Sequence, residues 1–220
     1  MEDFLGYMSF SLIESFAVFS ILFLFRINLF KIMGVVVLVS TLINIQNFFI
    51  REELSLSGLS TIINVVLTTI FFIAYLRIPL IWSILITLSG ALYVGAIQTV
   101  IIYSSLGYFS LHEVQDIAWK GYTVQALSGL IGMSIGWGFY KLGKGFTFEL
   151  EKLRFKGERI FVVSLISAII VVLGLMISFE SIFTNLIIFV VSSALLVAYY
   201  LRKDLEAHDP SLGEQARDSY

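Results

Sequence analysis

The chain has 220 residues, of which 58% are hydrophobic and only 14% charged, and its mean hydropathy is +0.94. These values lie far outside the range of soluble domains and predict an integral membrane protein. The absence of Cys excludes disulfides, thiolate metal sites and a cysteine nucleophile, and a net charge of -2 does not suggest a nucleic-acid partner.

Seven apolar runs are long enough, at about 20 residues each, to cross a hydrocarbon core of about 30 Å. They cover residues 4–25, 32–50, 56–76, 80–104, 121–140, 160–179 and 182–201. The last two are separated only by Phe179-Glu180-Ser181, and we place a tight turn there because one helix of about 40 residues would be about 60 Å long. The sequence therefore predicts an all-α, multi-pass bundle in the cell membrane.

The Lys and Arg residues set the predicted orientation. If the N-terminus lies outside, twelve of the fourteen cations fall in inner loops or the tail, and only Arg51 and Lys120 lie outside. Trp and Tyr residues near the span ends agree with this topology, because they favour the membrane interfaces. We therefore expect a transmembrane domain over residues 1–203 with an external N-terminus. A cytoplasmic polar tail, residues 204–220, should follow it and should be disordered.

Glu14 stands in the first run, within SLIESF, close to the predicted bilayer midplane. A carboxylate there costs at least about 2.5 kcal/mol, so it is expected to face protein or water. No Lys or Arg lies at a matching depth in another run, so its partners must be neutral. Amides of the other runs lie within roughly 4 to 12 Å of the outer ends. They are Asn44, Gln46, Asn47, Asn64, Gln98, Gln125 and Asn185.

A polar outer half above an apolar inner half describes a cavity that opens to the outside and is closed below. We expect its ligand-binding residues to be Glu14, Asn44, Gln46, Asn64 and Gln98. The alternative is that the amides reach interfacial water or bond a neighbouring helix, which contributes only about 0.6 kcal/mol each.

One predicted outer loop, SLHEVQDIAWK at residues 110–120, opens with Ser110 followed by Glu113, the spacing of a capping box. It predicts a short helix on the outer surface, acting either as a lid over the cavity or as a plain connector. The inner segment 141–159 carries six cations among apolar residues at helical spacing. It favours anionic lipid, and docking of a cytoplasmic or membrane signalling partner is the alternative.

In the run at 121–140, Gly132 and Gly136 form a GxxxG pair, which lets two helices approach closely. Packing inside the bundle is the favoured use of this pair, and a homodimer is the alternative.

Motifs of enzymes are missing from the sequence. There is no HExxH pair, no glycine-rich phosphate loop and no Ser or Asp protease pattern in the spans. His112 and His208 are not at metal-ligand spacing. We expect no catalysis, no cofactor and no metal.

The first span with its acid, SLIESFAVFSILFLF, is followed by a basic turn, RINLFK, and by further spans that exit through YYLRKDLEAH. In these features residues 1–206 resemble the membrane sensor region of the peptide-pheromone histidine kinases of Gram-positive bacteria, the accessory-gene-regulator type. In that family a dimerisation helix with a phosphorylated His and an ATP-binding domain follow; here only RKDLEAHDPSLGEQARDSY follows. His208 precedes Asp209-Pro210, so the phospho-acceptor role is not carried onto it.

These observations lead to three hypotheses of different classes. The first is a non-enzymatic receptor or signal-transducing module that senses an extracellular peptide or small ligand in the outer cavity, either cut from a longer sensor or acting through a partner. The second is the substrate-binding membrane subunit of a small-molecule transporter, a class that usually has six spans with both termini inside. The third is a structural or assembly protein of the membrane.

Overall fold

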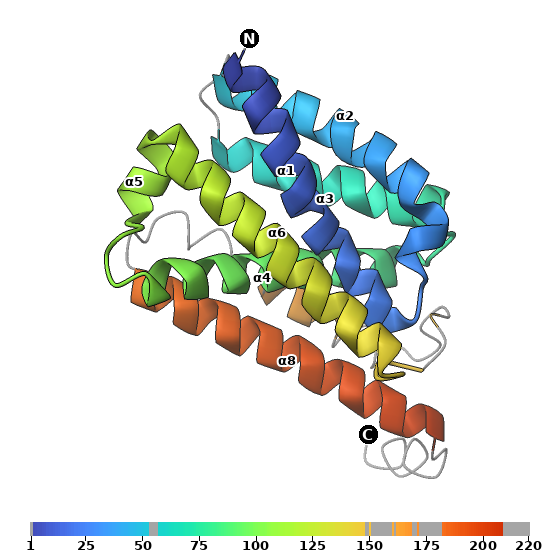
Figure 1. Ribbon diagram of the computed structural model, residues 1–220. Helices are drawn as coiled ribbons and strands as arrows, with labels where there is room; N and C mark the ends of the chain where they lie inside the picture. Colours follow the sequence, from blue (N-terminus) through green and yellow to red (C-terminus); the bar gives the residue numbers. More distant parts are fainter. Residues whose placement is uncertain are drawn as a thin grey trace.

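The structure is a computed structural model that describes residues 2–52, 57–147, 150, 160, 162–168, 171 and 182–208. In these ranges every regular element is a helix (Figure 1). Two short 3-10 helices, η1 and η2, lie between α1 and α2. The elements are α1 (Glu2–Ser20), η1 (Ile21–Phe25), η2 (Leu29–Ile32), α2 (Met33–Glu52), α3 (Ser57–Ala74), α4 (Leu80–Ser104), α5 (Leu111–Asp116), α6 (Ala118–Lys141) and α8 (Ile182–His208).

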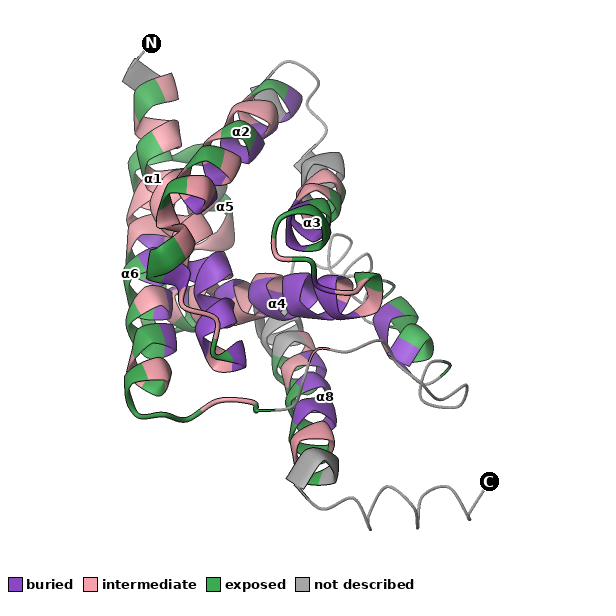
Figure 2. Ribbon diagram, turned by 90° about the vertical axis from the view of Figure 1, so that its right-hand side faces the viewer, coloured by how far each residue is buried: buried purple, intermediate pink, exposed green. Residues whose placement is uncertain are grey.

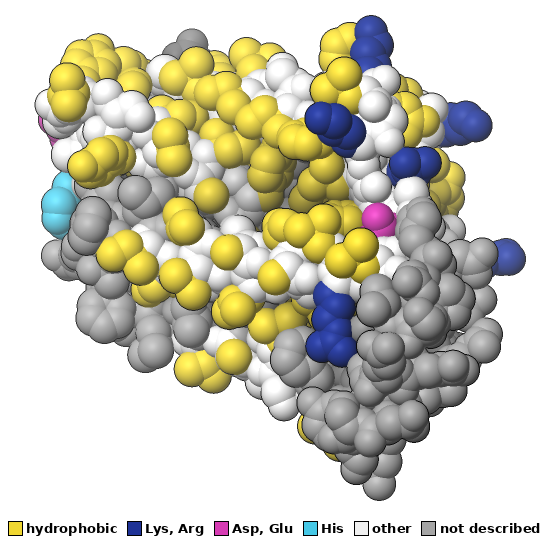
Figure 3. Space-filling model, turned by 90° about the horizontal axis from the view of Figure 1, so that it is seen from below, with side chains coloured by type: hydrophobic (Ala, Val, Ile, Leu, Met, Phe, Trp, Pro, Cys, Tyr) yellow, Lys and Arg dark blue, Asp and Glu magenta, His cyan; other side chains and the backbone are white. Residues whose placement is uncertain are grey.

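Within the described ranges, three helical segments are long and apolar enough to cross a membrane. They are Phe4–Phe25, Leu29–Ile50 and Leu80–Ser104, and a shorter apolar helix covers Ile62–Ala74. Large apolar side chains also cover the outside of the bundle (Figure 3), as at Leu5, Leu42 and Leu130, which are 62%, 59% and 62% exposed. Such a surface is unusual for a protein in water and suits contact with lipid. These features are those of a helical membrane protein.

The helices match the predicted runs in position, with differences at their ends. The predicted runs 121–140 and 182–201 lie within α6 and α8, while the turn at Glu180 and most of the run at 160–179 lie outside the described residues. α6 starts at Ala118 because Ile117, with φ -107° and ψ 102°, is extended and separates it from α5. Crossing of the membrane by seven spans stays a prediction.

The polar tail expected from residue 204 begins as a helix, because α8 continues to His208. Asp204 fixes this last turn to the loop after α6: its Oδ1 accepts hydrogen bonds from the Thr147 backbone N–H at 2.6 Å and from Thr147 Oγ1 at 2.7 Å. Residues 209–220 of the expected tail lie outside the described part of the chain.

The basic turn after α1 is a compact reversal. Arg26 has a left-handed backbone, with φ 56°, and its N–H closes onto the Phe23 carbonyl at 3.1 Å. The Asn28 side chain then accepts from the Phe30 N–H at 3.0 Å and caps η2. A left-handed conformation is uncommon outside Gly, Asn and Asp. The turn is held further by Arg26 Nη2, which donates to the Gly143 carbonyl at 2.9 Å.

Glycines of α6 pack directly on α1. A Cβ atom built on Gly132 would lie 2.7 Å from the Ala17 Cβ, and one on Gly136 would lie 2.9 Å from the Ser20 carbonyl oxygen. Both distances are too short for any larger residue. The GxxxG pair is therefore occupied by a helix of the same chain, the favoured one of the two predicted uses.

α4 lies at the centre of the bundle and is buried along most of its length (Figure 2). Trp82, near its start, stacks on Tyr199 and Tyr200 of α8 with ring centroids 5.9 and 6.4 Å apart. Phe25 and Phe146 contact the same Tyr200, each at 5.1 Å. The end of η1, the start of α4, the loop after α6 and the end of α8 therefore meet in one aromatic cluster.

On the face shown in Figure 3, the Lys and Arg side chains gather toward one end of the bundle, the end where this cluster lies. Among the cations whose side chains are described, only Lys120, near the start of α6, lies elsewhere. We call the end that holds the cluster the cationic end. Its cations are Arg26, Lys31, Arg77, Lys141, Lys144, Arg202 and Lys203.

Candidate functional site: two cavities of opposite chemistry

A cavity of about 420 Å³, here called the polar cavity, lies among α1, α2, α3, α4 and α6. Its lining combines one carboxylate, amides and hydroxyls. The polar lining residues are Tyr7, Ser11, Glu14, Ser15, Ser40, Asn44, Asn47, Asn64, Thr68, Thr87, Gln98 and Gln125.

Glu14 reaches this cavity from α1 and is half-buried. Its Oε1 accepts a hydrogen bond from Gln98 Nε2 of α4 at 2.8 Å. This amide supplies a hydrogen-bond donor to the acid without adding a second buried charge. The neutral partner expected from the sequence is thus present in Gln98.

Several other polar atoms of the lining have no protein partner. Asn47 Oδ1, Asn64 Oδ1 and Gln125 Oε1 are buried and accept no hydrogen bond from the described residues. The buried hydroxyls of Ser11 and Ser40 likewise have no partner in this part of the chain. Leaving such a group unsatisfied costs about 1 to 3 kcal/mol. Buried polar atoms of this kind are normally bonded to water or a ligand. The polar cavity therefore offers unused acceptors beside a carboxylate.

Four of the five predicted ligand-binding residues line this cavity, one from each of four helices. These four are Glu14, Asn44, Asn64 and Gln98. Asn44 also lies 3.4 Å from Ser15 Oγ, across the gap between α2 and α1.

Gln46 differs from the other four predicted residues, because it is not among the lining residues, although both its amide atoms are buried without a partner. Its neighbour Asn47 lines the cavity instead, as does Gln125 of α6. Both belong to the same set of outer amides in the sequence, so the signal for them was present. The serines carried no such signal, since a helical serine commonly bonds its own backbone, as Ser15 Oγ does to the Ser11 carbonyl at 2.8 Å.

A second cavity of about 480 Å³, here called the apolar cavity, lies toward the cationic end among η1, α4, α6 and α8. Leu24, Leu92, Phe139 and Leu196 are typical of its walls. Lys144 and Asp204 are also among its lining residues.

Four of the five hydroxyls that line the apolar cavity, those of Ser20, Ser89, Tyr93 and Tyr200, are bonded within the protein. Ser89 Oγ and the Tyr200 hydroxyl lie 2.8 Å apart. The Tyr93 hydroxyl and Ser20 Oγ both donate to the Gly132 carbonyl, at 2.6 and 3.2 Å. These groups need no water, so the cavity suits hydrocarbon.

α5, the predicted outer surface helix, has the expected capping box: Ser110 Oγ accepts from the Glu113 N–H at 3.2 Å, and the Glu113 carboxylate accepts from the Ser110 N–H at 3.3 Å. Lys120 Nζ lies 2.9 Å from Glu113 Oε2. The pKa of Glu113 is lowered below its ordinary value of 4.5, mainly by the hydrogen bond from the Lys120 ammonium and secondly by the hydrogen bonds from Ser110. None of the described side chains of α5 lines the polar cavity, which favours a connector over a lid.

The inner segment 141–159 is described only at its start and at Leu150. There the chain docks on the bundle: the Phe146 N–H donates to the Leu24 carbonyl at 2.7 Å. Residues 148–149 and 151–159, where the signalling partner was expected to dock, lie outside the described residues.

No family model, curated protein or solved structure matches the chain. Among the described residues, no group of three or more His, Asp or Glu side chains is placed to hold a metal ion. The case for a function therefore depends on the cavities themselves.

Proposed function

We propose that the protein is a multi-pass, non-enzymatic membrane receptor that binds a small ligand in the polar cavity and signals to the cytoplasm. The observation that carries this proposal is the set of buried, unpartnered amide oxygens around the Glu14 carboxylate. A bundle that needed these amides only for helix packing would pair them with each other.

The volume of the polar cavity, about 420 Å³, falls in the range of small-molecule sites, roughly 300 to 1,000 Å³. This favours a small ligand over a peptide among the two kinds expected from the sequence. The free oxygens of Asn47, Asn64 and Gln125 accept hydrogen bonds, and Glu14 adds negative charge. The complementary ligand is a small cation with several N–H donors, such as a primary amine.

The proposed topology has seven spans, with the N-terminus outside and the cationic end in the cytoplasm. It is supported by the gathering of Lys and Arg at one end of the bundle, which in membrane proteins faces the cytoplasm. The polar cavity, with Tyr7 and Gln125 near the first turns of α1 and α6, then lies toward the outside.

The signal is proposed to pass along α1 and the η1 helix that continues it. α1 lines the polar cavity at Val18 and Phe19, and the apolar cavity is lined by Ser20 at the end of α1 and Ile21 at the start of η1. A rotation of this helix changes both cavities. The resemblance of residues 1–206 to peptide-pheromone sensor regions agrees with a sensor role and supplies the expected readout, a histidine kinase partner on the cytoplasmic side.

A direct test measures thermal unfolding of the purified protein in micelles with ethylammonium, putrescine or guanidinium, and with propanediol as a neutral probe of similar size. We expect at least one cation, and not propanediol, to raise the unfolding temperature. Glu14→Gln should abolish the effect while keeping the fold, because a Gln oxygen can still accept from Gln98. Glu113→Gln, at an exposed acid on α5, is the matched control and should respond like the wild type.

Equal responses of the Glu14→Gln and wild-type proteins, or no response to any cation, would contradict this ligand class. The transport alternative is separated by a pulldown from the native membrane. A stoichiometric ATPase pair indicates a transport subunit, whereas a histidine kinase indicates a receptor. A protein that binds no probe and no partner supports the structural alternative.

A further inference from the structure

We propose that the apolar cavity binds one acyl chain of a phosphate-bearing membrane lipid, with the lipid phosphate on Lys144. This site is separate from the polar cavity and does not depend on the ligand proposed there.

The lining of the apolar cavity follows one face of α8, at Ser193, Leu196, Val197, Tyr200, Leu201 and Asp204. Its lining on α8 extends over residues 193–204, roughly 16 Å at 1.5 Å per residue. Parts of α4 and α6, over residues 89–96 and 135–139, form the opposite walls. An apolar space that extends this far along a helix suits an acyl chain entering from the bilayer better than a compact solute.

The cavity interior offers water few free polar groups, so water competes weakly with a hydrocarbon chain for this space. Ser89 and Tyr200 are bonded to each other, and Tyr93 and Ser20 are bonded to the Gly132 carbonyl. Water in this cavity would therefore find few free polar groups, and filling the space with an acyl chain removes apolar wall area from water.

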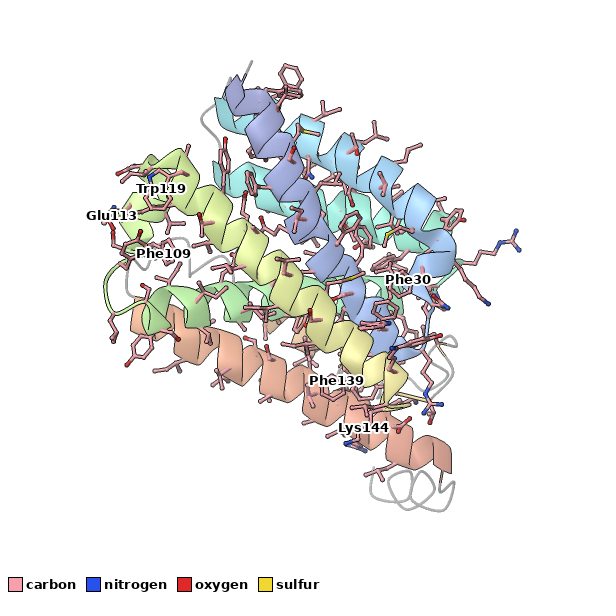
Figure 4. All side chains as sticks on the ribbon, viewed as in Figure 1. Phe30, Phe109, Glu113, Trp119, Phe139 and Lys144 are labelled. Atoms are coloured by element: carbon pink, nitrogen blue, oxygen red, sulfur yellow. The ribbon has the colours of Figure 1, made fainter. Side chains whose placement is uncertain are left out.

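Lys144, an exposed residue of the cavity lining, supplies positive charge where the cavity meets the surface, here called the mouth, and this charge selects the lipid headgroup. Lys144 and Phe139 both line this cavity, and Figure 4 shows them near the end of α6. Lys144 is exposed and makes no ion pair with any described residue. The other groups nearby are engaged: Asp204 accepts from Thr147, and Lys141 lies 4.1 Å from the Trp137 ring centroid.

The location of the cavity at the cationic end of the bundle also favours a lipid phosphate. Arg26, whose guanidinium donates to the Gly143 carbonyl, adds positive charge next to the mouth. Basic sites at the ends of membrane helices attract lipid phosphates, and a lysine offers such a phosphate a compact charge with three donors. A lipid with net negative charge is therefore preferred over a zwitterionic one.

The test uses native mass spectrometry of the full-length protein in micelles, after adding equal amounts of phosphatidylglycerol and phosphatidylcholine. We expect one lipid to stay bound to the wild-type protein, with phosphatidylglycerol preferred at least fivefold. Lys144→Gln should keep a bound lipid but lose the preference, whereas Lys31→Gln, an exposed cation at the same end that does not line the cavity, should keep it.

Occupancy is tested by filling the cavity from two walls. Ala96→Leu on α4 and Ser193→Leu on α8 should each lower lipid retention at least fivefold, and Ala194→Leu, on the exposed side of α8, should not. Two separate variants guard against misfolding of one, and thermal unfolding checks each. Retention of several lipids, equal in filled and control variants, would mean contact with bulk lipid only and would overturn the proposal. An unchanged headgroup preference in Lys144→Gln would overturn the role of that residue.

Discussion

The polar and apolar cavities have similar volumes, about 420 and 480 Å³, but the polar groups that line them differ in their hydrogen bonding. In the apolar cavity the Ser89 and Tyr200 hydroxyls are bonded to each other, so they are not available to a solute. In the polar cavity the side-chain oxygens of Asn47 and Asn64 are buried and have no donor among the described residues. A buried polar group signals a ligand site only when the protein itself leaves it unbonded.

The change from one cavity to the other takes place within a single turn of α1. Phe19 lines the polar cavity and Ser20 the apolar one. The close packing of α1 on the glycines of α6 closes the bundle at this level, so breaking that contact should disturb both cavities together.

The largest effect is expected from Gly129→Ala in α6. A Cβ at this position would lie 2.7 Å from the Ile13 carbonyl oxygen, and backbone cannot give way as a side chain does. Overpacking of this kind costs about 1 to 3 kcal/mol. Gly138→Ala is the control, because nothing lies within 4 Å of its Cβ, and it should leave stability unchanged or slightly raised. Unfolding in mixed micelles measures both; equal stabilities would refute the close contact.

Within the polar cavity, two substitutions by Leu should have opposite signs. Gln98→Leu removes the donor to the Glu14 carboxylate and should lower the free energy of unfolding by about 1 to 3 kcal/mol. Asn64→Leu removes an unbonded buried oxygen and should raise it by up to about 1 kcal/mol.

Both variants should weaken binding of the cationic probes, which separates a binding role from a packing role. Loss of stability in Asn64→Leu would mean that its amide is held by a partner after all. Unchanged probe binding in both variants would indicate that these amides serve only as contacts between helices.

In the apolar cavity, the Ser89 and Tyr200 hydroxyls should behave as one coupled pair. Ser89→Ala alone should cost about 1 kcal/mol, because it removes the Ser89 partner of the buried Tyr200 hydroxyl. Tyr200→Phe should cost less, because Ser89 Oγ still donates to the Leu85 carbonyl at 2.7 Å. The double variant should cost less than the sum of the two. A double-mutant cycle on the unfolding free energies measures the coupling, and additive costs would argue against the bond.

The smallest effect is expected at α5, outside both cavities. Since the pKa of Glu113 is lowered in the folded chain, its contribution to stability is fully present above 4.5 and is lost as pH falls through the lower folded value. Hydrogen exchange of residues 110–117, corrected for intrinsic rates, should therefore increase over that window, and Glu113→Gln should remove the pH dependence. Binding of the cationic probes should not follow the state of α5. A parallel loss of binding in wild-type protein but not in Glu113→Gln would make α5 a lid.

Local features were predictable because they depend on neighbouring residues. The pair Ser110 and Glu113 forms its capping box within four residues of chain. The described helices follow the apolar runs closely at most ends, although α8 continues seven residues past the run at 182–201. The demand of Glu14 for a neutral partner was also predictable, because an acid in an apolar span has few alternatives.

The choice between Gln46 and Asn47 was not predictable in the same way. Adjacent residues of a helix point about 100° apart, so a modest rotation of α2 exchanges one for the other. That rotation is fixed by long-range contacts, such as the packing of Phe48 on Phe4 and Tyr7 with ring centroids 4.9 and 5.5 Å apart. The apolar cavity could not be predicted from the sequence, because its walls are ordinary apolar residues of η1, α4, α6 and α8.

The sequence by itself determined an all-helical chain with membrane-length apolar segments, its cations concentrated in a few turns, and a set of amides that had to find partners or water. The tertiary structure decided which of these amides meet, which are left unbonded, and where unfilled apolar space remains. The physical reason is that segment length and composition are local properties, whereas the rotation and spacing of helices are set by side-chain packing between segments far apart in the chain.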